Sequence, residues 1–265
     1  MTGSTSSLSL WDETAVILTT DHGHDLGERG VFGKQYPHFD SHANRIPLFV
    51  WHPEKPGYGN SISDLTQTVD LFSTVLDFAG VPGVQATHGQ SLLPVLEGKG
   101  GPREALSYGT FGQGVCVTDG RWTLFKSPQD GAPLNYYSSM LYKSLVLDTV
   151  APPDGQGRFI PGVELPQWRV PVRVGPEKVN PGGLTDFLFD RAEDPGQKRN
   201  LWDHAPQERQ RMLDLTRAVI SEEGTPQSST NASASPSDPA LTLTHNPNPS
   251  NMATAIVNKH NRQSS

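Results

Sequence analysis

The chain has very little cysteine and no long hydrophobic run. Cys116 is the single cysteine among 265 residues, so an intrachain disulfide is excluded. No window approaches the roughly 18 consecutive apolar residues of a membrane-spanning helix. Met1 is not followed by a charged region and an apolar region of the secretory type, so the cytoplasm is the default compartment for the chain as given.

An excess of basic residues is also missing. Lysine and arginine together number 21 against 28 aspartates and glutamates, which gives a formal net charge of −7. Nucleic-acid binding proteins concentrate positive charge to neutralise phosphates, and no basic stretch is present here. We therefore expect no nucleic-acid partner.

The two ends have almost no aromatic residues. Serine, threonine, asparagine, proline and alanine dominate residues 222–265, and residues 1–9 are similar. Such segments cannot bury enough apolar surface to offset the entropy of ordering. We predict that residues 1–9 and 222–265 are disordered.

The most informative stretch present is Asp21-His22-Gly23, which directly follows an apolar run at residues 15–18 and two threonines. The apolar run shows no period-2 alternation, which is typical of a strand covered on both faces, as in a parallel sheet. A carboxylate and an imidazole at the end of such a strand are candidate metal ligands, and glycine permits a close backbone approach. These residues alone leave a second interpretation open, in which Asp21 caps the following turn and His22 is a surface histidine.

A glycine-rich loop and a second strand follow. Gly27, Gly30 and Gly33 favour a loop over a helix, and Lys34 comes just after them, within reach of the first strand's end. Residues 45–51 indicate a second buried strand, with Pro47 near its start, where a missing N–H is tolerable.

Several segments, in this order and at this spacing, resemble the downstream half of the sulfatase family within the alkaline-phosphatase superfamily. They are Asp21-His22-Gly23, Leu26-Gly27-Glu28, Gly33-Lys34, Phe39-Asp40, Arg45-Ile46-Pro47-Leu48, Thr68-Val69-Asp70-Leu71, Thr74 to Val81 and His88 to Leu96. The agreement extends over roughly residues 11–125, and residues 188–195 with Asn200-Leu201 resemble the family's C-terminal strand and turn.

The resemblance implies roles for individual residues. Asp21 and His22 match the second pair of metal ligands, and Lys34 matches the lysine that contacts the sulfate oxygens. His38 is a further candidate for substrate binding, although neither it nor Glu28 has a settled assignment in the family. The implied substrate is a small-molecule or saccharide sulfate ester.

The same resemblance identifies parts that have no counterpart here. The family's Cys/Ser-x-Pro/Ala-x-Arg motif, whose cysteine or serine becomes the formylglycine nucleophile, and two further metal-binding aspartates lie upstream in complete relatives. Cys116 lacks the proline and arginine of that motif, and we interpret it as a small residue buried in a strand. We therefore expect a truncated enzyme without turnover of its own. A shortened gene model, an excised fragment and a degenerate paralogue remain open.

The metal and the reaction each leave alternatives. Calcium prefers oxygen ligands, so a histidine ligand favours manganese or zinc in isolation. Sulfatases with Asp-His at this position that use calcium make Ca²⁺ the first choice, with Mn²⁺ or Zn²⁺ as alternatives. Phosphonate monoester and phosphodiester hydrolases of the same superfamily are the nearest rival function, and a noncatalytic remnant acting as a binding module is the third.

The predicted fold class is α/β: part of an alkaline-phosphatase-like mixed or parallel sheet sandwiched by helices, with a small C-terminal antiparallel subdomain. Residues 10–105 form the first part and 106–221 the second, which includes an irregular insertion at 127–183. Asp70 is predicted to cap a core helix that ends at Gly80.

The C-terminal part should contain a hairpin and a helix. Asp119-Gly120 predicts a type I′ hairpin between strands at 115–118 and 121–125, with another strand near 187–189. Pro206 opens a last helix that should pack on this sheet through Met212, Leu213 and Ile220.

Overall fold

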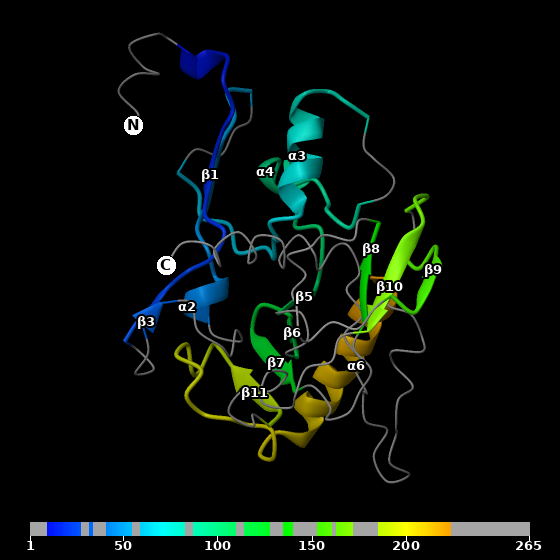
Figure 1. Ribbon diagram of the computed structural model, residues 1–265. Coiled ribbons are helices and arrows are strands. Elements are labelled where there is room, and N and C mark those ends of the chain that lie inside the picture. The colour runs from blue at the N-terminus through cyan, green and yellow to red at the C-terminus, as the bar shows by residue number, and fades with distance from the viewer. Residues whose placement is uncertain are drawn as a thin grey trace. The chain divides into compact units, whose positions relative to one another are not determined.

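A computed structural model describes residues 10–27, 32–33, 41–54, 59–82, 87–109, 114–127, 135–139, 153–160, 163–171 and 185–223. The chain divides into two compact units, residues 1–104 and 105–265, which are described one at a time (Figure 1). The predicted disordered start, residues 1–9, and all but the first two residues of 222–265 lie outside the described residues. No helix in the described part of the chain is both long and apolar enough to span a membrane.

The first unit contains short strands and short helices. In chain order they are η1 (Leu10–Asp12), β1 (Val16–Thr19), β2 (Asp25–Leu26), β3 (Phe32–Gly33), α2 (Ser41–Asn44), β4 (Leu48–Trp51), α3 (Asp70–Phe78) and α4 (Leu93–Leu96). β1 pairs with β4, and β2 pairs with β3, both antiparallel.

The strand predicted at 15–18 exists as β1, but it is not covered on both faces. Its described partner is β4, with Leu18 opposite Phe49 in the register. Those two side chains are 62% and 65% exposed, and Val16 is also exposed. The expectation of a doubly covered strand was wrong for the described structure, because no described layer packs against this face of the two-stranded ribbon.

Helix α3 ends as predicted and begins differently. Gly80 follows the helix with a φ of +64°, the left-handed conformation that favours glycine at this position. The N-cap is Val69 rather than Asp70, which was the predicted cap. The Asp70 carboxylate is fully buried and instead accepts N–H groups from Gln67, Gln90 and Arg103, so its oxygens bind neighbouring segments rather than capping the helix.

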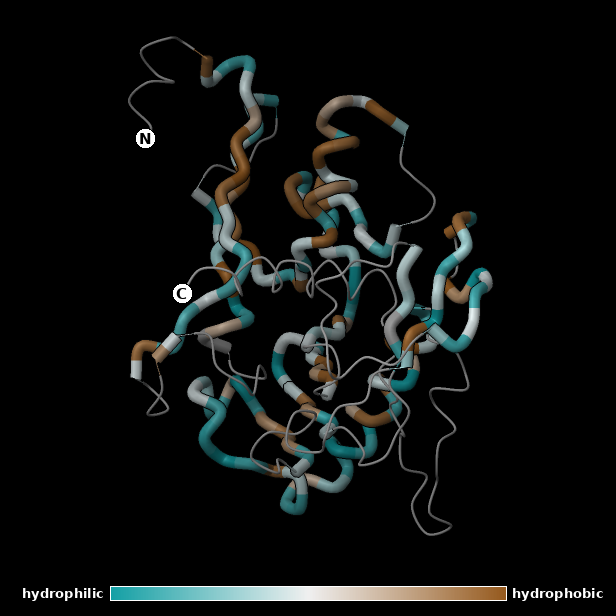
Figure 2. The backbone as a smooth tube through the Cα atoms, in the orientation of Figure 1, coloured by the Kyte–Doolittle hydropathy of each residue, from teal (hydrophilic) through white to brown (hydrophobic). Residues whose placement is uncertain are grey.

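The predicted core role of this helix was wrong for two of its apolar residues. Phe72 and Val75 are 53% and 51% exposed, whereas the polar Thr74 is fully buried. The Thr74 hydroxyl donates to the Asp70 carbonyl and accepts from the Leu92 N–H. A polar network thus holds α3 in the first unit, while Phe72 and Val75 stay exposed. Figure 2 shows hydrophobic residues, in brown, along both α3 and β1.

The second unit has a four-stranded antiparallel sheet in the order β11-β7-β6-β5. The strands are β5 (Leu106–Gly109), β6 (Val115–Thr118), β7 (Trp122–Lys126) and β11 (Phe187–Asp190). Helix α6 (Pro206–Glu222) packs on it, as predicted, and Val117, Leu124, Leu188 and Met212 form a core with no solvent exposure.

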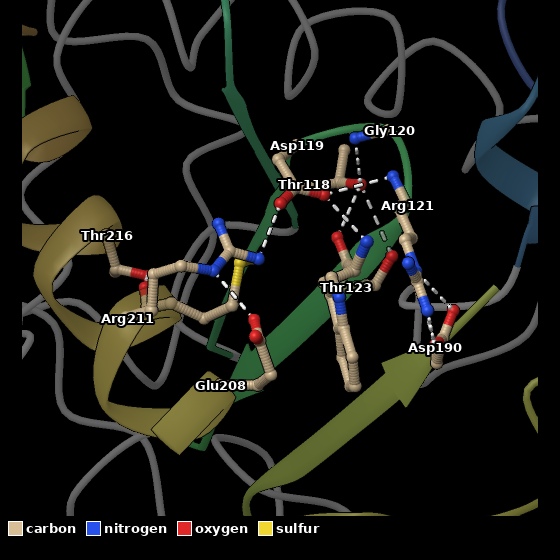
Figure 3. Close-up of polar contacts among 11 residues, drawn as sticks. Thr118, Asp119, Gly120, Arg121, Thr123, Asp190, Glu208, Arg211 and Thr216 are labelled. Carbon is tan, nitrogen blue, oxygen red and sulfur yellow. Dashed lines mark hydrogen bonds and ion pairs between the residues drawn. The ribbon is translucent and has the colours of Figure 1, made fainter. Parts of the chain in front are cut away.

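The hairpin between β6 and β7 forms, but its turn differs from the prediction. The last register pair is Thr118 with Thr123, so the loop is longer than the two residues of a type I′ turn. Only Gly120 has a positive φ, of +93°, where type I′ needs two such residues. The Asp119 carboxylate accepts the N–H groups of Arg121 and Trp122, and this local bonding favours the longer turn (Figure 3).

Part of the segment predicted to be irregular also forms a sheet. β8 (Asn135–Ser138), β10 (Gln167–Pro171) and β9 (Gly155–Gly157) pair antiparallel in that order. The ring centroids of Tyr137 and Phe159 are 5.1 Å apart, consistent with local aromatic packing.

Candidate functional site

The candidate ligands Asp21 and His22 lie in the loop that leaves β1. Two hydrogen bonds fix the start of this loop: the Thr19 hydroxyl donates to the Pro47 carbonyl (2.8 Å), and the Gly23 N–H donates to the Ala43 carbonyl (2.8 Å). Ala43 is buried in the short helix α2. The loop is therefore anchored both to the segment that enters β4 and to α2.

The Asp21 carboxylate and the His22 ring converge. Asp21 Oδ1 accepts the His22 backbone N–H at 3.0 Å, and Asp21 Oδ2 lies 3.6 Å from His22 Nε2. A separation of 3.6 Å is too long for a hydrogen bond, so the two atoms lie side by side without bonding each other. Both atoms are thus available to a third group.

The hydrogen bond of His22 Nδ1 indicates which ring nitrogen is free to bind a metal. Nδ1 lies 2.7 Å from the Gly23 carbonyl oxygen, which can only accept, so Nδ1 is the protonated nitrogen of the neutral ring. Nε2 is then the unprotonated atom, and it is the one beside the carboxylate. Histidines that bind metals commonly donate their second N–H to a carbonyl in this way.

The spacing and the exposure of these donors fit one divalent cation. At metal–ligand lengths of about 2.0–2.2 Å for zinc or about 2.3–2.6 Å for calcium, adjacent ligand atoms are about 3–3.7 Å apart. The observed Nε2 to Oδ2 distance of 3.6 Å falls within that range. The Asp21 side chain is 43% exposed and that of His22 is 14% exposed, so solvent reaches the pair.

Within the described ranges, no group of three or more His, Cys, Asp or Glu side chains is arranged to hold a metal ion. The described part of the chain therefore brings two candidate ligands together. Lys34 and His38, the predicted substrate-binding residues, lie outside the described residues, as does Glu28.

Sequence reasoning missed two neighbours of the pair. The Thr20 hydroxyl donates to the His22 carbonyl at 3.2 Å and lies 3.4 Å from Asp21 Oδ1, so it helps to hold the loop. The sequence could have indicated this contact, because a threonine two residues before the histidine is typical of a turn stabilised by a hydroxyl group. His24 stacks on His22 with ring centroids 5.6 Å apart, a contact that the alternate spacing of the two histidines permits.

Cys116 is placed as predicted, inside β6 of the second unit and 1% exposed. Burial raises the pKa of its thiol far above the ordinary value, so the reactive thiolate is suppressed. The buried cysteine is a packing residue of the sheet.

The comparisons with known proteins agree with the family resemblance. Residues 6–81 match the family model described as Sulfatase, and this range contains both candidate ligands. These residues form a sulfatase-family segment. An N-acetylglucosamine-6-O-sulfatase from Bacteroides thetaiotaomicron is 38% identical over 89 residues, which is 34% of this chain and 16% of that enzyme.

Solved structures with low sequence identity share the fold of this segment and of much of the remaining chain. One is a protein in complex with its substrate D-glucosamine-2-N,6-O-disulfate, with a TM-score of 0.55 and 19% identity over 87% of this chain and 37% of that chain. Another is a phosphonate monoester hydrolase from Silicibacter pomeroyi, with a TM-score of 0.54 and 20% identity over 84% of this chain and 37% of that chain. The predicted α/β class is thereby confirmed, although every strand pair among the described residues is antiparallel rather than parallel. The chain covers 37% of each of these two solved chains.

Proposed function

We propose that this chain carries the Asp-His half of the metal site of a sulfate monoester hydrolase. The observation that supports this most is the Asp21–His22 pair itself. It lies inside the segment that matches the sulfatase family, and Asp21 Oδ2 lies 3.6 Å from His22 Nε2, the nitrogen without a proton in the neutral tautomer that the Nδ1 contact favours. Oδ1 also accepts the His22 N–H, as a carboxylate that caps a turn would, but the His22 side chain is only 14% exposed and is not a surface histidine.

The chemistry follows from the negative charge of the substrate. Asp21 and His22 would hold the divalent cation, with Ca²⁺ first and Mn²⁺ or Zn²⁺ as alternatives. When bound, this cation supplies positive charge to the sulfate oxygens. Lys34 would contact the same oxygens with its ammonium, a compact charge that stabilises negative charge growing in the transition state. The Nδ1 bond of His22 to Gly23 keeps Nε2 free to act as a ligand.

The proposed substrate class is a saccharide sulfate ester. Both the N-acetylglucosamine-6-O-sulfatase relative and the structure solved with a glucosamine disulfate support this choice. Cys116 would not supply the formylglycine nucleophile of the intact family, because it is buried and has no arginine at the motif spacing. Ser41-His42-Ala43-Asn44-Arg45 has the residue types of the motif but follows the Asp21–His22 pair, whereas the motif of the family precedes that pair.

One specific observation favours a second candidate. The phosphonate monoester hydrolase is as similar in fold as the sulfated-sugar enzyme, with TM-scores of 0.54 and 0.55. A phosphonate monoester hydrolase is therefore the alternative function, and a noncatalytic remnant that acts as a binding module is the third.

A chimaera tests the proposal. The segment of the Bacteroides thetaiotaomicron sulfatase that matches this chain is replaced by the corresponding residues of this chain, and hydrolysis of an aryl sulfate and of an aryl phosphonate is measured. We expect sulfate hydrolysis that Asp21→Ala and Lys34→Ala each reduce by about two orders of magnitude or more. His88→Ala, which changes an exposed histidine of the same unit, is the control and should leave the rate unchanged.

Each result assigns the function. A chimaera that prefers the phosphonate supports the alternative, and a folded chimaera without either activity supports the noncatalytic remnant. Unchanged sulfate hydrolysis in Lys34→Ala contradicts the role given to Lys34.

A further inference from the structure

The exposed hydrophobic residues of this chain are distributed very unevenly. Among the described residues, ten of the eleven exposed large hydrophobic side chains belong to the first unit, and Leu165 is the exception in the second. The second unit buries its aliphatic residues in a closed core, whereas the described fully buried hydrophobic residues of the first unit are Ala43, Leu92 and Val95. The described residues of the first unit thus present apolar faces that no described core of this unit covers.

The clearest of these faces is the one formed by Leu18 and Phe49, with Val16 at its rim, which we term the β1–β4 face. Leu18 and Phe49 are opposite each other in the antiparallel register, so their side chains project on the same side of the ribbon. The two side chains are 62% and 65% exposed. No residue of β1 or β4 is fully buried.

Such a ribbon needs an additional layer to be stable. Two paired strands are marginal in water, and independent stability requires further strands or a helix on an apolar face. Among the described strands, β1 and β4 have only each other as hydrogen-bonded neighbours. The ribbon thus offers an apolar face for helices and an edge for another strand.

Helix α3 presents a second apolar surface in the same unit. Phe72 and Val75 are three residues apart, so they lie on one side of the helix, and both are about half exposed. The opposite side is held by the buried Asp70 and Thr74. An amphipathic helix whose polar side faces its own unit is suited to pack its apolar side on another element.

We propose that the β1–β4 face is the docking surface for the part of a sulfatase-family domain that this chain does not contain. The fold comparisons support this occupant, because 87% of the chain aligns with only 37% of a solved relative, so more than half of that relative lies outside the aligned part. A remainder built of strands and helices supplies what the ribbon lacks, namely a neighbouring strand and an apolar helical layer. This inference rests on the family assignment and not on the hydrolytic activity.

Binding in trans tests the proposal. The full-length chain is mixed with a polypeptide that comprises the Bacteroides thetaiotaomicron sulfatase up to its matched segment, and affinity is measured by biolayer interferometry. We expect complex formation, with Leu18→Asn and Phe49→Asn each weakening the affinity about tenfold or more. Leu165→Asn is the matched control, since Leu165 is 64% exposed but lies in the second unit. The affinity of this variant should stay within about twofold of that of the wild-type chain.

Hydrogen exchange on the same samples identifies the occupant. The proposal requires that the β1 and β4 amides exchange fast in the free chain and become protected on mixing. Protection already present in the dilute free chain means that the chain covers the face itself, and protection that grows with its own concentration means that a second copy does; either result overturns the proposal. Absence of binding, or equal weakening by Leu165→Asn, overturns it as well, and none of these results depends on hydrolysis.

Discussion

At the scale of single residues, His22 is defined by its two ring nitrogens. Nδ1 is bonded to the Gly23 carbonyl and Nε2 lies beside the Asp21 carboxylate, so the ring is oriented before any ligand arrives. Orienting contacts of this type typically contribute tenfold to a hundredfold in metal affinity, because they remove the cost of fixing the ring.

A metal titration checks the role of His22. Because only two candidate ligands lie together in the described part of the chain, we expect the full-length chain to bind Mn²⁺ or Ca²⁺ with a Kd of about a millimolar. His22→Ala should weaken this by about tenfold or more, while His88→Ala should not change it. Manganese paramagnetic resonance reads the free ion directly, and calcium binding at micromolar strength would show that the site is more complete than we infer.

Cys116 predicts a pH dependence of stability. Its thiol pKa is raised by burial, so the unfolded chain releases this proton near the ordinary value of 9.0 while the folded chain retains it. Stability is therefore fully present below about pH 8 and falls as the pH rises past 9, by up to about 1.4 kcal/mol per pH unit for one group.

The measurement is urea unfolding at several pH values between about 7 and 10. Cys116→Ala lacks the thiol, so between about pH 9 and 10 its free energy of unfolding should fall about 1 kcal/mol less than that of the wild type. The pKa of the neighbouring Tyr108 is also raised by burial, and this residue remains in the variant. Identical pH profiles for the two proteins would be inconsistent with a strongly raised thiol pKa.

Residue types in the sequence led to the prediction that Asp21 and His22 are metal ligands, which stays a prediction, and they did not specify the geometry of the pair. The order Asp21-His22-Gly23 after an apolar run indicated a ligand pair, and the structure brings the two side chains together. The Nδ1 contact to Gly23 depends on the local backbone path, which the residue types do not specify. Lys34 and His38 remain sequence predictions because they lie outside the described residues.

At the scale of elements, the Asp70–Arg103 pair holds α3 against the segment that precedes the second unit. Asp70 is fully buried, the Arg103 side chain is 11% exposed, and the guanidinium donates to both carboxylate oxygens. Removing one member of such a pair leaves an uncompensated buried charge, which costs about 3–5 kcal/mol.

Replacing the basic residue of each ion pair with methionine compares the buried Asp70–Arg103 pair with a surface pair. Arg103→Met should destabilise the first unit by about 3–5 kcal/mol, whereas Lys99→Met should cost less than about 0.5 kcal/mol. Lys99 also contacts a carboxylate, that of Glu97 at 2.8 Å, but its side chain is 70% exposed. Native-state hydrogen exchange of the α3 amides measures both effects, and equal exchange rates in the two variants would contradict the buried-pair argument.

Elements were predictable where a local signal agreed with the packing. Helix α6 begins at Pro206 and places Met212 in the core, as its periodicity indicated. The β6–β7 hairpin was found from Asp119-Gly120, but its loop length was not, because the Asp119 carboxylate competes for backbone N–H groups. For α3 the apolar periodicity was real, yet Phe72 and Val75 face outward because the polar residues of the helix have partners in the first unit.

At the scale of the whole molecule, the two units differ in how much of their apolar surface is covered. Phe125 in β7 is 2% exposed and Phe72 in α3 is 53% exposed. Replacing each with alanine therefore compares a buried phenylalanine with an exposed one. Phe125→Ala should cost about 3–5 kcal/mol through lost burial and a cavity, while Phe72→Ala should stay within about 1 kcal/mol. Chemical denaturation of each variant, analysed by unit through hydrogen exchange, measures the difference. A large cost for Phe72→Ala would mean that its side chain is covered in solution.

The α/β class followed from the motif order, but the distribution of buried surface did not. Periodicity identifies which residues are apolar on one side of an element, and it cannot state which layer covers that side. The sequence therefore predicted a core role for α3 and a doubly covered β1, and the described structure leaves both partly open.

The sheet of the second unit also has a consequence for biosynthesis. Its first strand is tied to the end of α6 by a hydrogen bond of 2.6 Å from the Ser107 hydroxyl to the Glu223 carboxylate, 116 residues apart in sequence. Because chains emerge from the ribosome N-terminus first, at about 5–20 residues per second, this core cannot close until α6 has been made. The exposed apolar residues of the first unit therefore leave the ribosome before the core of the second unit can form.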